Sequence, residues 1–368
     1  MTDETNKSKA NGVAPERRTY VRLWTGLGIV VAVLLPQVLQ YYQQDHLIHV
    51  AGLIAIYALL ALGLNVIIGY TGILNLGYAA FYGIGAYTAA LLSIHLHLSF
   101  WILLPISGLA AAAAGALIGM TTLRLRGDYI AIVTLGFVEI VRLGLNNLDS
   151  ITNGPKGLPG VGQTIAAPQL TLAGHVLKLD TDLGYYYFIL LLALGTVFVL
   201  LRLHNSRVGR SWVSIREDES ASEIMGVNTT AMKVQAFAAG TFFAGVAGCV
   251  YTHWVGFITP ELFTFWESVL LVCMIVLGGM GSTAGVLLGA LLIVGIPEVL
   301  RDILQQFSGV GGASAMKSFY DSLILARMLI FGVIMIAMVI FRPQGLIPPK
   351  RPRFNVRKTG ADVPAGGD

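Results

Sequence analysis

Long apolar runs separated by short polar stretches dominate this chain of 368 residues. From His46 to Leu123 there are 78 consecutive residues without Asp, Glu, Lys or Arg. A helix needs roughly 20 apolar residues to cross a bilayer core about 30 Å thick, so this block alone holds about three spans. The pattern predicts an all-α fold, a polytopic bundle of transmembrane helices.

Apolar windows predict about ten membrane spans along the chain. They cover residues 24–42, 47–68, 72–93, 99–121, 128–145, 183–201, 232–253, 265–280, 284–300 and 322–341. We therefore divide the chain into an N-terminal tail (1–23), a transmembrane domain (24–342) and a basic C-terminal tail (343–368). Within the domain, residues 146–182 form a long loop on one side of the membrane and residues 204–231 a charged loop on the other.

The distribution of Lys and Arg predicts which loops face the cytosol and which face the outside of the cell. Lys and Arg accumulate on the cytosolic side of a membrane. With the N-terminus in the cytosol, ten spans put 18 of the 24 Lys and Arg in cytosolic segments, four in external segments and two near or within spans. The split predicts that both termini and the 204–231 loop are cytosolic, and that the 146–182 loop is external.

Two apolar stretches, Gly69–Tyr87 and Leu277–Pro297, are rich in glycine. Small residues let helix backbones approach closely, and glycine beside Asn or Ser also marks broken helices that are buried in protein or line a wet cavity. Tight packing alone and a substrate path both stay open. The candidates for a substrate path are polar side chains near these positions: Asn65, Thr71, Asn75, Tyr78 and Thr134.

Few ionisable residues lie inside the predicted spans. Glu139 and Arg142 are three positions apart, so they can pair on one helix face. Such a pair either neutralises itself or acts as a gate on an ion path. Because a proton-driven pump would bury more charges, energy is expected to enter from outside this polypeptide.

Familiar catalytic motifs are absent from the sequence. No GxxxxGK[ST] occurs, so the chain is not expected to bind ATP through a P-loop. It has no HExxH and no carboxylates clustered as metal ligands, and Cys249 and Cys273 lie in apolar spans without metal-ligand spacing. We expect no catalysis, no metal and no cofactor in this chain.

The charged loop contains the stretch RVGRSWVSIREDESASEIMGVN, from Arg207 to Asn228. A short helix is predicted there, with Ser211 as N-cap, Trp212, Ile215 and Met225 at roughly helical spacing, and Gly226 as the residue after the C-cap. A solvated linker is the alternative to a docking surface. Tryptophan favours docking, because a linker does not need one.

Several ordered stretches resemble the membrane subunit of branched-chain amino acid ABC importers, the LivM-type permease family. They are GLNVIIGYTGILNLGYAAFYGIGAY (Gly63–Tyr87), RLRGDYIAIVTLGFVEIVRL (Arg124–Leu143), NGPKGLPGV (Asn153–Val161), VGRSWVSIREDESASEIMGVN (Val208–Asn228), SVLLVCMIVLGGMGSTAGVLLGA (Ser268–Ala290) and FRPQGLIP (Phe341–Pro348). The resemblance covers most of the chain between about residues 50 and 350.

The resemblance implies a bacterial cytoplasmic (inner) membrane importer in which the charged loop is a coupling helix that inserts into an ATP-binding subunit. The residues that would make this contact are Trp212, Arg216, Glu217, Asp218, Glu219, Glu223 and Gly226. The implied partners are a second, homologous permease, two ATPase subunits that use ATP and Mg²⁺, an extracytoplasmic solute-binding protein and the lipid bilayer, and no nucleic acid.

Three other functions are alternatives to branched-chain amino acid import. An importer of urea or short-chain amides has similar permeases. A secondary amino acid transporter driven by Na⁺ or H⁺ is disfavoured by the scarcity of buried carboxylates, and a membrane enzyme by the absence of a catalytic cluster. For the importer, leucine, isoleucine and valine are the expected substrates.

Overall fold

The structure is a computed structural model that describes residues 45–122, 129–159, 169–172, 175–178 and 181–298. It also describes short stretches at 32–34, 36–37, 40, 332–333, 336, 340–342 and 344–348. The described residues form seven helical segments that are long and apolar enough to cross a membrane. They are α2 (Asp45–Asn65) with its continuation η1 (Val66–Tyr70), α3 (Tyr78–Leu96), α4 (Phe100–Thr122), α5 (Tyr129–Asn147), α7 (Asp182–His204), α10 (Thr229–Val255), and the segment Pro260–Gly278, which contains η3 (Pro260–Leu262) and α11 (Phe265–Gly278).

These helices correspond to the seven predicted spans from 47–68 to 265–280, which confirms a polytopic helical bundle. The predicted span at 284–300 is a shorter apolar segment made of α12 (Thr283–Ala290) and η4 (Leu291–Gly295). The predicted spans at 24–42 and 322–341 lie mainly outside the described residues. The total of ten therefore stays a prediction.

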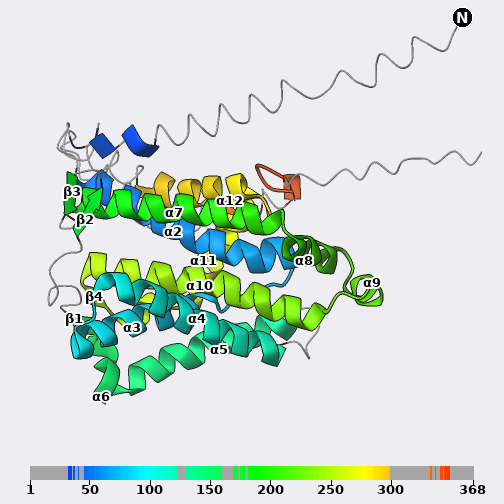
Figure 1. Cartoon of the computed structure of the whole chain (residues 1–368), viewed down its shortest axis with the longest axis horizontal. Helices are drawn as coiled ribbons and strands as arrows, with labels where there is room; N and C mark the ends of the chain where they lie inside the picture. The colour runs from blue at the N-terminus through cyan, green and yellow to red at the C-terminus, as the bar shows by residue number, and fades with distance from the viewer. Residues whose placement is uncertain are drawn as a thin grey trace, which may run out of the picture.

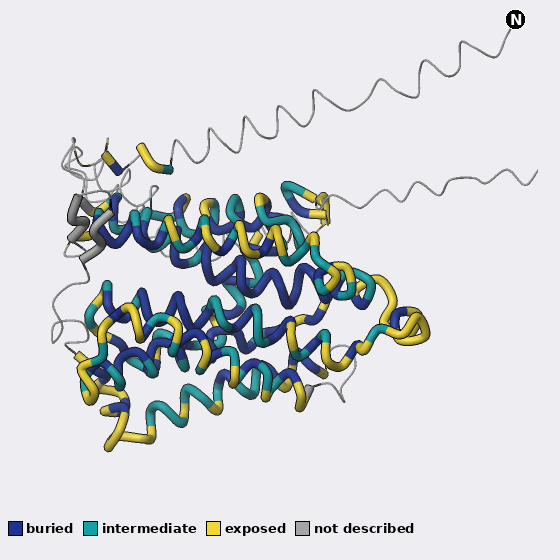
Figure 2. Tube along the Cα trace, in the orientation of Figure 1, coloured by how far each residue is buried: buried dark blue, intermediate teal, exposed yellow. Residues whose placement is uncertain are grey.

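The bundle is built around α10, which packs against α4, α3 and α2 (Figure 1). Small residues bring these helices together. A Cβ atom added at Gly245 of α10 would overlap the backbone of α4 at Ser107, and one added at Gly248 would meet the carbonyl oxygen of Tyr82 in α3 at 2.5 Å. Burial is deepest along α2, α3 and α10, lower on α4, and lowest on α5, at the edge of the bundle (Figure 2).

The two ends of the bundle differ in structure (Figure 1). One end carries α8 (Arg207–Glu217) and α9 (Glu219–Ile224). At the other end lie α6 (Asp149–Thr152), η2 (Gly154–Lys156), η3 (Pro260–Leu262) and four short strands, β1 (Leu158–Pro159), β2 (Gln169–Leu172), β3 (His175–Lys178) and β4 (Phe257–Ile258). β1 pairs antiparallel with β4, with Leu158 opposite Ile258, and β2 pairs antiparallel with β3.

The structure is mostly helical, as predicted, and the strands are short additions to it. The 146–182 segment was predicted only as a long loop, yet it supplies three of the four strands found among the described residues. Strands of two to four residues are too short to show a clear alternation of apolar and polar positions. The β1–β4 pairing also joins segments about a hundred residues apart, which local sequence does not reveal.

Both glycine-rich stretches interrupt helices, which is one of the two interpretations that the sequence left open. The helix α2 ends in the π-helical turn η1 and Thr71, and a non-helical segment, Gly72–Gly77, leads into α3. The second break, Gly279–Ser282, separates α11 from α12. Gly279 has φ +118° and Gly281 φ +87°, a region that favours glycine because other residues are strained there.

Candidate functional site

The charged loop folds as a helical hairpin formed by α8 and α9. Ser206 begins α8, and its hydroxyl accepts a hydrogen bond from the amide of Gly209. The prediction that Ser211 is the N-cap is therefore wrong, because the N-cap is Ser206, five residues earlier. Ser211 instead lies inside α8, where its hydroxyl donates to the carbonyl of Arg207.

Trp212 fixes α8 to the bundle. Its side chain is fully buried, and the indole Nε1 donates to the carbonyl oxygen of Met232 in α10 at 2.8 Å. Ile215 lies one turn later and is also buried. The predicted apolar face of this helix is therefore real for Trp212 and Ile215.

Asp218 divides the predicted single helix into two. Its backbone is extended (φ −157°, ψ 111°), and its Oδ1 accepts from the amide of Ala221 at 2.9 Å, so it is the N-cap of α9. Aspartate favours helix caps over helix interiors because its short side chain bonds to nearby amides. The sequence prediction overlooked this competing preference.

Gly226 ends α9 as predicted. Its φ is +85°, its amide bonds to the carbonyl of Glu223, and the amide of Val227 bonds to that of Ser222. This pair of bonds is a Schellman motif, in which glycine adopts the left-handed conformation after the helix.

The end of α9 exposes two large apolar side chains. Ile224 is 85% exposed and Met225 82% exposed, and α9 projects from the end of the bundle (Figure 2). Met225 was predicted on the same apolar face as Trp212, which is wrong because the break at Asp218 turns α9 away from α8. We call Glu223, Ile224 and Met225 the α9 tip. Ile224 was missed, although an apolar pair directly before the terminating glycine marks such a tip.

The seven residues predicted to contact an ATPase thus lie in different surroundings. Six of them are exposed: Arg216, Glu217, Asp218, Glu219, Glu223 and Gly226. Trp212 is buried against the bundle, and Arg216, although exposed, donates to the carbonyl oxygen of Gly69 at the end of η1. Glu219 forms an ion pair with Lys233, a buried residue in the first turns of α10 that sequence analysis did not single out. The docking role of these residues stays a prediction.

The five candidates for a substrate path gather around the first helix break and are all buried. Asn65 Oδ1 accepts from the amide of Gly281 at 2.9 Å, so it joins the first break to the second. Thr71 donates to the carbonyl of Ile67, and Tyr78 donates to that of Gly240 in α10 at 2.8 Å.

Asn75 and Thr134 bind the backbone directly before α3. Asn75 Oδ1 accepts from the amide of Gly77 and Thr134 Oγ1 from that of Leu76. The first amides of a helix lack intrahelical partners. Ser268 of α11, which sequence analysis missed, accepts from Ala79 at 2.9 Å. The buried Nδ2 atoms of Asn65 and Asn75 have no hydrogen-bond partner among the described residues. A substrate-path role for these side chains stays a prediction.

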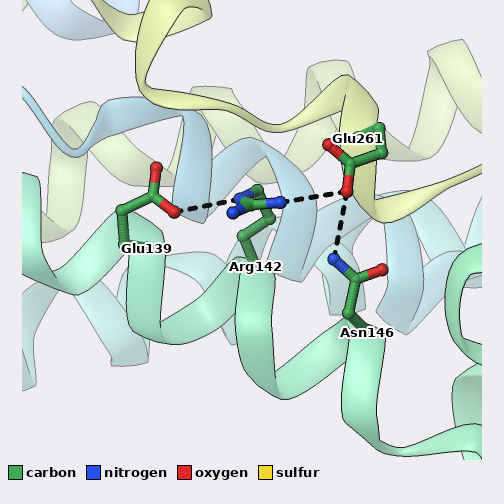
Figure 3. Close-up of polar contacts among 4 residues, drawn as sticks. All are labelled: Glu139, Arg142, Asn146 and Glu261. Carbon is green, nitrogen blue, oxygen red and sulfur yellow. Dashed lines mark hydrogen bonds and ion pairs between the residues drawn. The ribbon is translucent and has the colours of Figure 1, made fainter.

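Glu139 and Arg142 pair as predicted, at 3.0 Å between Oε2 and Nε (Figure 3). The structure adds two partners that the sequence did not indicate. Arg142 Nη1 also contacts Glu261 Oε1 at 2.9 Å, and Asn146 Nδ2 donates to the same oxygen at 3.1 Å. The network joins α5 to η3 toward the end opposite α8. A structural role, the joining of α5 to η3, is therefore sufficient to explain why Glu139 and Arg142 pair. Their role as a gate on an ion path stays a prediction.

With this geometry in place, comparison with known proteins identifies the family. A family model described as "Branched-chain amino acid transport system / permease component" matches residues 46–339. The chain belongs to this permease family.

Individual relatives agree with the match. The permease is 40% identical over 350 residues to the high-affinity branched-chain amino acid transport system permease protein LivM of Salmonella typhimurium, covering 89% of this chain and 75% of the relative. It is 41% identical over 335 residues to LivM of Escherichia coli, covering 85% and 73%. LivH of Salmonella typhimurium, a permease protein of the same named system, is 28% identical over 258 residues, covering 66% and 81%. No solved structure matches the permease.

The resemblance noted in the sequence is thereby confirmed. In the part of the chain that the structure describes, the permease also has seven apolar helical segments long enough to cross a bilayer, as expected of a multi-pass membrane protein. The charged insert between apolar spans forms the α8–α9 hairpin at one end of that bundle.

Proposed function

We propose that this permease is the membrane-spanning subunit of an ATP-binding cassette importer for the branched-chain amino acids leucine, isoleucine and valine. The 40% identity to LivM over 89% of the chain carries the proposal. The permease acts in the bacterial cytoplasmic (inner) membrane and contains no P-loop, so ATP is hydrolysed by separate subunits. It forms the translocation path with a second permease, and its similarity to LivH as well as LivM supports such a pair.

The α9 tip is the part that engages an ATPase subunit. The charged hairpin at the end of the apolar bundle exposes the side chains of Ile224 and Met225 beside Glu223. Exposed apolar side chains rimmed by polar residues mark protein interaction sites. A short helix held rigidly by Trp212 and by the Glu219–Lys233 pair is suited to pass a push from the ATPase into α10.

The orientation follows from charge. The α8–α9 end faces the cytosol, because the cytosolic segments of the threaded chain hold most of the Lys and Arg. The opposite end, with α6 and the β1–β4 pair, then faces outward and serves the solute-binding protein as a docking surface.

Uptake of labelled leucine and of labelled urea tests this function. Cells that lack the subunit are complemented with the wild-type chain, and uptake is measured with and without depletion of ATP. The proposal predicts leucine uptake that disappears when ATP is depleted. Uptake of urea alone would assign the permease to amide import, and leucine uptake that survives ATP depletion would indicate an ion-coupled transporter.

A further inference from the structure

Arg216 of α8 caps the C-terminal end of the α2–η1 helix. The last carbonyl groups of a helix have no intrahelical partner. After η1, the amides of Gly72 and Ile73 bond to the carbonyls of Ile68 and Ile67. The carbonyl of Gly69 accepts from the guanidinium Nη1 of Arg216, although 147 positions separate the two residues.

Electrostatics favour this contact. Aligned peptide dipoles leave partial negative charge at the C-terminal end of a helix, which stabilises a cation there. Arginine keeps its charge at any physiological pH, and hydrogen bonds from a charged donor are roughly twice as strong as neutral ones. Arg216 therefore provides a permanent, charge-assisted link between α8 and the end of the α2–η1 helix.

Two glycines make room for the arginine side chain. A Cβ atom added at Gly72 would lie 3.0 Å from Arg216 Cγ, and one added at Gly281 would lie 3.0 Å from Arg216 Nη1. Gly72 belongs to the first helix break and Gly281 to the second. The guanidinium thus lies where the two breaks meet, and the bond from the Gly281 amide to Asn65 Oδ1 holds the breaks together at the same place.

The hairpin consequently has separate links to separate parts of the bundle. Trp212 ties α8 to α10 through the carbonyl of Met232, and Glu219 ties α9 to α10 through Lys233. Arg216 donates the side-chain hydrogen bond that joins the hairpin to the end of η1, where the first helix break begins. A displacement of the hairpin therefore reaches the segment Gly72–Gly77, which leads directly into α3, by way of this residue.

We propose that Arg216 is a positioning residue that transmits movement of the α8–α9 hairpin to the two broken helices, and that it is not part of the surface that binds the ATPase. This role rests on the proposed function, since it requires an ATPase to move the hairpin. It differs from the role that sequence resemblance gave Arg216, a direct contact with the ATPase.

Three variants of the intact importer, reconstituted in vesicles, test the role. Arg216→Gln removes the charge and the fork of donors, and Arg216→Lys keeps the charge with a shorter reach. Arg210→Gln is the matched control, because Arg210 is exposed on the same helix and bonds locally to the carbonyl of Asn205. The readouts are ATPase subunit bound per permease, ATP hydrolysed, and leucine taken up per ATP.

Arg216→Gln is expected to bind the ATPase and to hydrolyse ATP as the wild type does, while leucine uptake per ATP falls roughly tenfold, within the usual range of coupling between sites. Arg216→Lys should recover part of the loss, and Arg210→Gln should match the wild type. A merely structural role would instead lower all three readouts together with the amount of folded permease.

Two outcomes overturn the role of Arg216 alone. One is an unchanged ratio of leucine to ATP in Arg216→Gln, and the other is loss of ATPase binding, which would place Arg216 on the docking surface. If the wild-type importer takes up leucine without ATP, the proposed function itself fails, and the transmission role fails with it.

Discussion

At the scale of single residues, Trp212 decides where the hairpin lies. It is among the largest fully buried side chains of the described structure, and it comes from a segment whose other residues are mostly polar. Its indole ring fills the space between α8 and the bundle, and its Nε1 satisfies the carbonyl of Met232. The hairpin is therefore a packed part of the permease and not a solvated linker.

Replacing this residue should loosen the hairpin in two steps. Trp212→Phe keeps a ring but leaves the Met232 carbonyl without its donor, at a cost of about 1 kcal/mol. Trp212→Ala also leaves a cavity and should cost about 3–5 kcal/mol. Thermal unfolding of the purified permease in detergent should rank wild type above Trp212→Phe above Trp212→Ala. Equal unfolding temperatures for all three would show that the ring does not hold the hairpin.

Sequence reasoning succeeded at this scale where the signal was local. The pairing of Glu139 with Arg142, the shared apolar face of Trp212 and Ile215 and the helix end at Gly226 all follow from spacing within one helix or one turn. The bond from Arg216 to Gly69 and the pair between Lys233 and Glu219 could not be predicted in this way. They depend on how the hairpin packs against the bundle, which a single sequence does not encode in any fixed spacing.

At the scale of elements, α5 depends on one polar network for its attachment at the end opposite α8. The helix lies at the edge of the bundle, and a Cβ atom added at Gly136 or Gly144 would meet nothing within 4 Å. Arg142 neutralises two carboxylates at once, Glu139 in α5 and Glu261 in η3 (Figure 3). Its loss leaves both acids without this cation.

Arg142→Gln should therefore destabilise the permease by about 1 kcal/mol, the upper range for partly exposed ion pairs. Glu261→Gln should cost less, because Arg142 keeps Glu139 and the side chain of Glu261 is 59% exposed. Thermal unfolding of the two variants in detergent, at low and at high salt, checks the order. A Glu261→Gln variant that is less stable than Arg142→Gln would contradict the assignment of Arg142 as the centre of the network.

Element boundaries show the same division between local and long-range signals. Glycine-rich stretches marked the two places where helices break, because glycine is costly inside a helix and permits positive φ, although their sequence alone did not exclude tight packing of unbroken helices. Splitting of the hairpin at Asp218 was missed, since its apolar spacing fits one continuous helix. The short strands of the 146–182 loop were missed because their pairing, rather than their own sequence, defines them.

At the scale of the whole molecule, successive spans run in alternating directions, and the charged hairpin lies at one end of the bundle (Figure 1). Residues 344–348 reach the same end, where the amides of Leu346 and Ile347 bond to the carbonyls of Leu277 and Gly278 at the end of α11. Seven of the ten threaded spans are matched by helices of sufficient length. Hydropathy predicts spans well because a helix in lipid must satisfy all its backbone groups internally.

This arrangement leaves the α9 tip as the most prominent exposed apolar feature of the hairpin. Ile224 and Met225 contribute little to the fold, since both are more than four-fifths exposed. Their replacement by charged residues should leave insertion and stability unchanged. The same change should abolish an interface that depends on them.

The most direct test of the account is therefore the amount of ATPase subunit that copurifies with an Ile224→Glu, Met225→Glu double variant. Arg207→Glu is the control, because it reverses a charge at an exposed position of α8 away from the tip. We predict that the double variant inserts normally and retains less than roughly a tenth of the ATPase, as expected when central apolar contacts of an interface are lost. The control should retain the wild-type amount. Full retention by the double variant would contradict the claim that the ATPase engages the permease through the α9 tip.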